Sequence, residues 1–133
     1  MSDLPAAVIR FAAVGAACLA AALVGCSSSF GPVDVVTQAS ALRILNSSDA
    51  PIYYFVVERQ SAALVDWAPC TKPSTCPSVA AHGDAEVPFS RIVGYEPGER
   101  EAIFYWWHLL PVPAGGFQVD SIRTRVVQLR QPL

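Results

Sequence analysis

The segment PIYYFVVERQ, residues 51–60, decides the class of fold that this chain adopts. The six residues from Ile52 to Val57 are all β-branched or aromatic, and such side chains are enriched in β-strands. Because side chains along a strand point alternately to opposite faces, this strand is apolar on both faces. A strand that is apolar on both faces must be covered on both, so the segment predicts a central strand.

Five further segments have the composition of short strands, and turn-forming residues separate them. None shows the periodicity of an amphipathic helix. They are residues 40–48 (SALRILNSS, preceded by Val36), 61–68 (SAALVDWA), 85–95 (AEVPFSRIVGY), 99–112 (EREAIFYWWHLLPV) and 119–129 (VDSIRTRVVQL).

This pattern predicts an all-β fold. We expect a single small antiparallel β-sandwich of six to seven strands over residues 35–133, with an immunoglobulin-like arrangement as the nearest architecture. Pro88 cannot donate to a strand ladder, so its segment is expected at an edge or a bulge. The sequence from Tyr95 to Gly98 contains the pair Pro97-Gly98, and it favours a type II turn, which prefers proline at its second position and glycine at its third.

The charge balance excludes nucleic acid from the expected partners. The formal net charge is -2, charged residues make up 15% of the chain, and no basic cluster dominates. Arg123, Arg125 and Arg130 lie among uncharged residues, so we expect them on the solvated face of a strand. Glu99 and Glu101 are expected to face Arg123 or Arg125 from a neighbouring strand.

The first 25 residues have the three parts of a secretory signal: a positive charge at Arg10, an apolar run from Phe11 to Gly25, and small residues at its end. The apolar run is shorter than the ~20 residues that a membrane-spanning helix needs. Residues 1–25 are therefore expected to form a helical signal segment that is removed from the mature protein.

Leu23-Val24-Gly25-Cys26 ends this apolar run and resembles the lipobox of bacterial lipoproteins. The resemblance implies that Cys26 carries a diacylglyceryl group and becomes the first residue of the mature protein, anchored in the membrane. Residues 26–34 would then be the lipidated cysteine and a flexible tether. Ser27 after the cysteine favours the periplasmic face of the outer membrane, or the outer surface of the cell membrane in an organism with one membrane.

Of the four cysteines, Cys18 would leave with the signal and Cys26 would carry lipid, so Cys70 and Cys76 remain as a disulfide pair. An alternative is a metal- or redox-active site that uses both cysteines with His82. The spacing of these three residues matches no zinc pattern, and no cofactor is expected.

The aromatic run from Phe104 to Trp107 is the most informative feature after the signal. Adjacent strand residues point to opposite faces, so Trp106 and Trp107 cannot both enter one core. One interpretation is an exposed contact surface of Tyr105, Trp106, Trp107 and His108 that binds an envelope protein or a glycan. The alternative is that a loop over residues 68–85, held by its disulfide, folds over the outer face.

The chain carries no nucleophile motif of the Gly-x-Ser-x-Gly kind. We therefore predict a non-enzymatic envelope lipoprotein with a structural or binding role. A small envelope hydrolase is the remaining alternative, and it would require Asp66, Asp84 or His108 to gather in one cleft.

Overall fold

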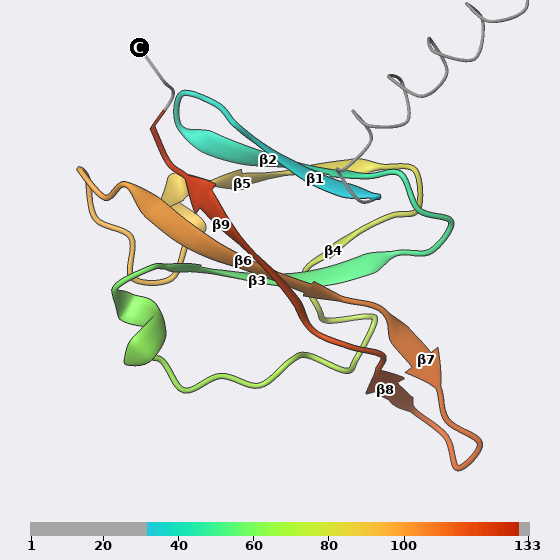
Figure 1. The fold of residues 1–133 in the computed structure, drawn as a ribbon. Helices are drawn as coiled ribbons and strands as arrows, with labels where there is room; N and C mark the ends of the chain where they lie inside the picture. Colours follow the sequence, from blue (N-terminus) through green and yellow to red (C-terminus); the bar gives the residue numbers. More distant parts are fainter. Residues whose placement is uncertain (1–31, 131–133) are drawn as a thin grey trace, which may run out of the picture. The chain divides into compact units, whose positions relative to one another are not determined.

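The computed structural model describes residues 32–130 of the chain, and in this range the secondary structure is almost entirely antiparallel β (Figure 1). The expected signal segment, the lipobox and Cys26 lie outside the described residues. Within 32–130, none of the helical segments has the length and apolarity to cross a bilayer. The elements are β1 (Val33–Thr37), β2 (Ala41–Asn46), β3 (Ile52–Glu58), the 3-10 turn η1 (Ser61–Ala63), β4 (Ser78–Val79), β5 (Asp84–Pro88), the 3-10 turn η2 (Phe89–Arg91), β6 (Glu101–Trp107), β7 (Leu109–Pro111), β8 (Phe117–Val119) and β9 (Arg123–Gln128).

The strands form three antiparallel sheets (Figure 1). One has the order β1-β2-β5 and a second has the order β4-β3-β6-β9, while β7 and β8 form a separate hairpin. The prediction that residues 52–57 form a central strand is confirmed, because β3 pairs with β4 on one side and with β6 on the other. The register between β3 and β6 places Tyr54 beside Trp106 and Phe55 beside Tyr105.

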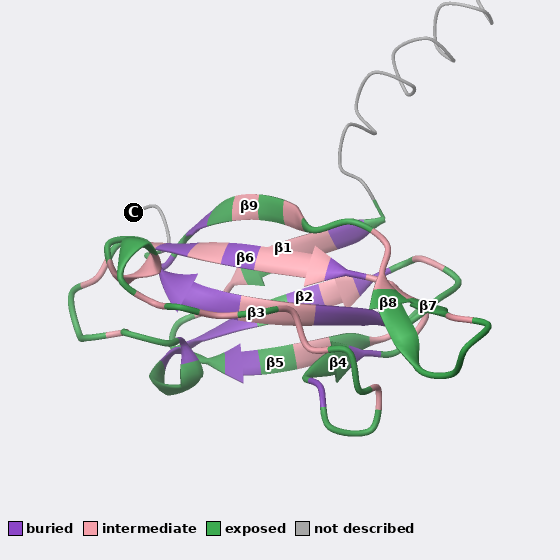
Figure 2. Ribbon diagram, turned by 90° about the horizontal axis from the view of Figure 1, so that it is seen from below, coloured by how far each residue is buried: buried purple, intermediate pink, exposed green. Residues whose placement is uncertain are grey.

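A shared apolar core joins the first two sheets (Figure 2). Leu42 and Ile44 come from β2, Ile52 and Val56 from β3, and Phe104 from β6, and all five side chains are buried. The alternation of side chains along a strand explains which residues enter this core, since every second residue of β2, β3 and β6 points into it. The packing of the two sheets against each other therefore follows from the apolar alternation in the sequence.

The prediction of a strand over residues 61–68 is wrong. This segment begins with η1 and continues as an extended loop without ladder partners. The predicted strand over 85–95 is shorter than expected: β5 ends at Pro88, and the chain turns into η2. The expectation for Pro88 is confirmed, because β5 is an edge strand of its sheet. The described residues contain nine strands rather than six or seven, because β1 is separate from β2, the 99–112 segment divides at His108 into β6 and β7, and β4 and β8 were not expected.

The expectation that Arg125 lies on the solvated face of its strand, opposite Glu99 or Glu101, is wrong. The Arg125 guanidinium is only partly exposed, and it lies 3.1 Å from the Asp34 carboxylate of β1 and 5.7 Å from the centre of the Trp106 ring. Glu101 pairs with Arg59 of the chain after β3 rather than with a β9 arginine. Arg125 thereby links the first strand of the described range to the last.

Different loops and strand ends lie at the two ends of the domain. The Pro32 carbonyl, just before β1, accepts a hydrogen bond from the Ser47 N–H in the β2–β3 loop. At the end of the same loop, the Pro51 carbonyl lies 3.1 Å from Nδ1 of His108, where the β7–β8 hairpin begins. The start of β1 and the hairpin therefore share one end, and the β1–β2 turn, η1 and η2 lie at the other (Figure 1).

Candidate functional site

The aromatic run of β6 divides between the two faces of its sheet, as the strand geometry requires. Phe104 is fully buried in the shared core, and Trp106 packs beside it with ring centres 5.2 Å apart. Tyr105 and Trp107 lie on the outer face and belong to a second apolar cluster around Tyr53. Trp107 is 1% exposed, so it is not part of a contact surface.

The chain between β3 and β4 covers this outer face. The Trp67 ring stacks on Phe55 at 4.6 Å and contacts Tyr105 at 4.7 Å between ring centres. The indole N–H of Trp107 donates a hydrogen bond to the Cys70 carbonyl oxygen, 3.1 Å away. Of the two interpretations of the aromatic run, the described residues show the covering loop, which begins earlier than expected because Trp67 is its main contact.

His108 stands at the junction of β6 and the β7–β8 hairpin. Its backbone N–H donates to the Asp120 carboxylate at 2.8 Å, and its ring nitrogen faces the Pro51 carbonyl. Asp120 also pairs with Arg123, and these donors hold its pKa below the usual value against the opposing effect of burial. The side chain of His108 thus helps to position the hairpin.

The residues of the metal or redox alternative are not brought together. Cys70 and Cys76 form a disulfide, as predicted, and a disulfide leaves no thiolate to bind a metal. His82 instead lies 2.7 Å from the Asp49 carboxylate in an exposed pair. Among residues 32–130, no three histidine, cysteine, aspartate or glutamate side chains are grouped in a way that could hold a metal ion.

The hydrolase alternative finds no assembled site either. Asp84 pairs with Arg43 across β2 and β5, at 3.0 Å, and both side chains are about half exposed. His108 contacts the Pro51 carbonyl rather than an acidic side chain or a hydroxyl through its ring. Asp66 lies exposed in the covering loop.

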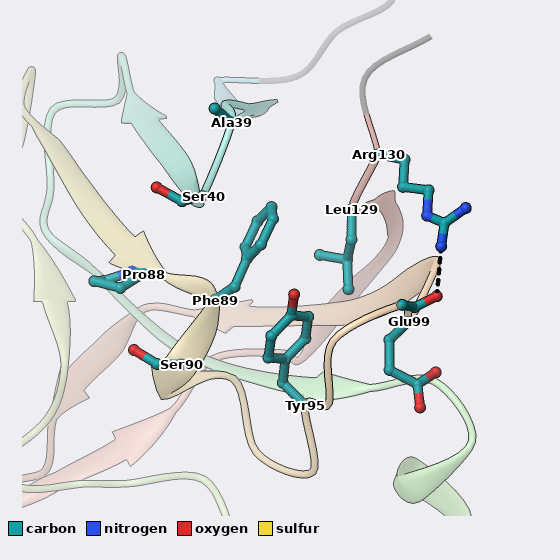
Figure 3. A pocket seen from close by; sticks show the side chains of 10 residues that line it. Ala39, Ser40, Pro88, Phe89, Ser90, Tyr95, Glu99, Leu129 and Arg130 are labelled. Atoms are coloured by element: carbon teal, nitrogen blue, oxygen red, sulfur yellow. Dashed lines mark hydrogen bonds between the residues drawn. The ribbon is translucent and has the colours of Figure 1, made fainter. Parts of the chain in front are cut away.

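A groove of about 550 Å³ opens at the end of the domain that carries η2 (Figure 3). Phe89 and Tyr95 form part of its wall, with ring centres 5.5 Å apart. Leu129 faces them from the end of β9, and the guanidinium of Arg130 donates to the Gly98 carbonyl at 3.0 Å. The groove therefore has an apolar floor with polar groups around it.

Three hydroxyl groups line this groove. The Tyr95 hydroxyl points between Phe89 and Leu129, while Ser40 and Ser90 are exposed at its rim (Figure 3). Within residues 32–130, no side-chain hydrogen bond engages any of the three hydroxyls. Each hydroxyl can donate one hydrogen bond and accept two, so the groove offers several sites to a ligand.

Two carboxyl groups lie together beside the groove. Glu58, at the end of β3, is 3% exposed and accepts the backbone N–H groups of Gln60 and Ser61, each at 2.8 Å. These hydrogen bonds lower the pKa of Glu58, with a further contribution from Glu99. The pKa of Glu99 is raised, mainly because burial disfavours its charged form and also because Glu58 beside it is negative.

Glu99 lines both the groove and a neighbouring cavity of about 320 Å³ that contains Glu58. The role of Glu58 was not predicted from the sequence, and Glu99 was expected in a surface ion pair. The available signal was the single acidic residue that ends the apolar segment 52–57, directly before a turn. An acid in that position can accept the unpaired N–H groups of the turn.

Comparison with known proteins gives no relative, since no family model, no curated protein and no solved structure matches this chain.

Proposed function

We propose that this protein is a lipid-anchored, non-enzymatic component of a bacterial cell envelope, whose β-domain binds an envelope glycan in the groove beside Tyr95. Its architecture is proposed to be an immunoglobulin-like sandwich of the two facing sheets. The membrane partner is reached through lipid on Cys26, at the periplasmic face of the outer membrane or, with a single membrane, at the outer surface of the cell membrane.

The position of the groove supports this proposal. If Cys26 carries the anchor, residues 27–32 join the bilayer to the end of the domain where β1 begins. The groove lies at the opposite end of β1, beside Ala39 and Ser40. A lipid-anchored domain would thus hold its groove away from the membrane surface, open to the envelope space.

The chemistry of the groove favours a glycan over an apolar ligand. The observation that carries this choice is the Tyr95 hydroxyl, which points into the groove and has no side-chain partner among residues 32–130. Sugars present many hydroxyls and also an apolar C–H face, which suits a groove that combines hydroxyls with Phe89 and Leu129. A partner protein is the other occupant that such a groove could take.

The anchor is tested by mass spectrometry of the full-length protein purified from membranes. We expect a mature N-terminus at Cys26 with a mass increase that corresponds to acyl chains. Cys26→Ser should lose the acyl mass and leave the membrane fraction. An unmodified cysteine in a membrane-extracted sample would rule out the anchor.

The groove is tested by co-sedimentation of the detergent-solubilised protein with insoluble peptidoglycan. Tyr95→Phe removes one hydroxyl from the groove, and we expect binding to weaken about five- to twelvefold, as the loss of one hydrogen bond of ~1–1.5 kcal/mol requires. Tyr105→Phe is the matched control, since it removes a hydroxyl from a half-buried ring outside the groove. Equal binding by both variants would exclude the Tyr95 groove as the binding site, and no sedimentation of the wild type would exclude this ligand.

A further inference from the structure

The β7–β8 hairpin is an apolar projection from the sheets (Figure 1). No acidic or basic residue occurs between positions 109 and 119, although charged residues follow at once in Asp120 and Arg123. Leu110 is 45% exposed and Phe117 is 43% exposed. Large apolar side chains with this exposure, grouped on one projecting element, indicate a surface that is covered when the protein functions.

The hairpin exposes apolar side chains on both of its faces. Pro111 pairs with Phe117 and Leu110 pairs with Gln118. Paired residues share a face and successive residues alternate, so Phe117 and Leu110 point to opposite sides. A protein partner that docks on one face would leave the other uncovered, whereas immersion in an apolar medium covers both.

The base of the hairpin is fixed to the domain by apolar packing. Leu109 and Val119 pack against the cluster that contains Trp107, which fixes the direction in which the hairpin projects. At the tip, the Val112 N–H donates to the Gly116 carbonyl at 3.0 Å, and the Gly115 N–H donates to the Val112 carbonyl at 2.9 Å. The turn therefore satisfies some of its own backbone groups, which reduces the cost of leaving water.

The hairpin and the start of β1 lie at the same end of the domain, connected through the β2–β3 loop. Residues 27–32 separate Cys26 from β1. Even fully extended, this tether spans only roughly 20–25 Å, at ~3.3–3.6 Å per residue. A lipid on Cys26 would keep this end of the domain beside the bilayer.

We infer that the β7–β8 hairpin inserts its tip, with Leu110 and Phe117, into the interfacial region of the bilayer that holds the lipid of Cys26. This inference rests on the proposed lipid anchor. Two attachments, the lipid and the hairpin, fix the orientation of the domain, so the groove beside Tyr95 points away from the membrane. Apolar side chains without charges suit the boundary between headgroups and acyl chains.

The experiment uses the full-length protein, purified from membranes and reconstituted in phosphatidylcholine vesicles with or without bromine on the acyl chains. Phe117→Trp places a fluorophore at the tip, and Leu110→Trp places one on the other face. Wild-type emission from the native tryptophans is subtracted. We expect brominated lipid to lower the fluorescence of each introduced tryptophan at least twofold.

Leu64→Trp is the matched control, because Leu64 is also apolar, is 88% exposed, and lies after η1 at the opposite end of the domain. Its added fluorescence should not change with brominated lipid. Equal quenching at positions 117 and 64, or no quenching at 117 and 110, would overturn the inference. Blue-shifted emission from Phe117→Trp without quenching would show that this chain or a second copy of it covers the hairpin, and would overturn the inference as well.

Mass spectrometry of the same sample separates this inference from the proposed function. A preparation without lipid on Cys26 contradicts the anchor itself. A lipidated preparation whose hairpin tryptophans are not quenched contradicts the hairpin insertion alone. Denaturation midpoints equal to that of the wild type establish that the variants are folded.

Discussion

At the scale of single residues, the pair of Glu58 and Glu99 shows how one environment moves two similar groups in opposite directions. Glu58 accepts two backbone N–H groups, which favour its ionised form and lower its pKa. Burial raises the pKa of Glu99, and the negative charge of Glu58 raises it further. Both directions are relative to the ordinary glutamate pKa of 4.5.

The two shifts make opposite contributions to stability. Glu58, with the lowered pKa, stabilises the fold above pH 4.5, and this contribution is lost as the pH falls through its folded pKa. Glu99, with the raised pKa, favours the folded state below pH 4.5, and this contribution is lost as the pH rises through its folded pKa. At neutral pH, the folded protein thus holds two like charges near each other.

Glu99→Gln should therefore raise the stability of the protein at neutral pH. Glutamine carries no charge to oppose Glu58, and it can still donate a hydrogen bond to that carboxylate. We expect the urea midpoint of Glu99→Gln to exceed that of the wild type at pH 7.5 and to approach it at pH 3.5. Glu86→Gln, at an exposed position of β5, is the control and should track the wild type at both values. A Glu99→Gln midpoint below that of the wild type at pH 7.5 would contradict the repulsion.

At the scale of elements, the sequence predicted strands best where both alternation and residue type agreed. Residues 52–57 form the central strand as expected, and the β6 aromatic run divides between two faces as strand geometry requires. The prediction for residues 61–68 was wrong because their small and aliphatic composition suits a strand locally, while in the folded chain they form η1 and a loop without ladder partners. The segment instead covers the outer sheet face through Trp67, a tertiary contact that local propensity does not report.

Trp67 should be the main stabilising residue of the covering loop. Its ring contacts Phe55, Tyr105 and Trp107. We expect Trp67→Ala to lower the free energy of unfolding by about 2–3 kcal/mol, below the full cost for a completely buried aromatic ring because Trp67 is partly exposed. Urea denaturation measures the loss. The emission of the remaining tryptophans should shift to the red as Trp107 meets water.

Leu64→Ala tests whether this effect belongs to the ring or to any apolar side chain of the loop. Leu64 is 88% exposed, so its truncation should change the stability by less than about 0.5 kcal/mol. Similar losses for both variants would mean that the loop acts through its conformation rather than through the contacts of Trp67.

At the scale of the whole molecule, the disulfide could be predicted from the sequence and the groove could not. The disulfide joins two nearby cysteines, and the pairing followed once the other two were assigned elsewhere. The groove instead combines the β1–β2 turn, η2, the loop before β6 and the end of β9. Such a site exists only after two sheets pack together, and no local pattern marks Ser40, Tyr95 and Leu129 as neighbours.

The contacts between β1 and β9 also belong to the scale of the whole molecule, because they join segments from the two ends of the described range. Arg125 pairs with Asp34 and lies over Trp106, so one side chain connects the first sheet, the last strand and the edge of the core. Thr37 adds a hydrogen bond from its hydroxyl to the Gln128 carbonyl. The Arg125 side chain is 29% exposed, which reduces the screening of its charge by water.

A double-mutant cycle with Asp34→Ala and Arg125→Ala should therefore give a coupling of about 0.5–1 kcal/mol, the upper part of the range for accessible ion pairs. Arg125→Ala alone should cost roughly 1–2 kcal/mol, because it also removes the contact with Trp106. The control cycle uses Arg43 and Asp84, whose side chains are 47% and 50% exposed, and should give a smaller coupling. Urea denaturation of the single and double variants measures both cycles. Equal couplings would mean that the contact between the first and last strands depends on apolar packing, with Arg125 and Asp34 contributing no more than an ordinary surface pair.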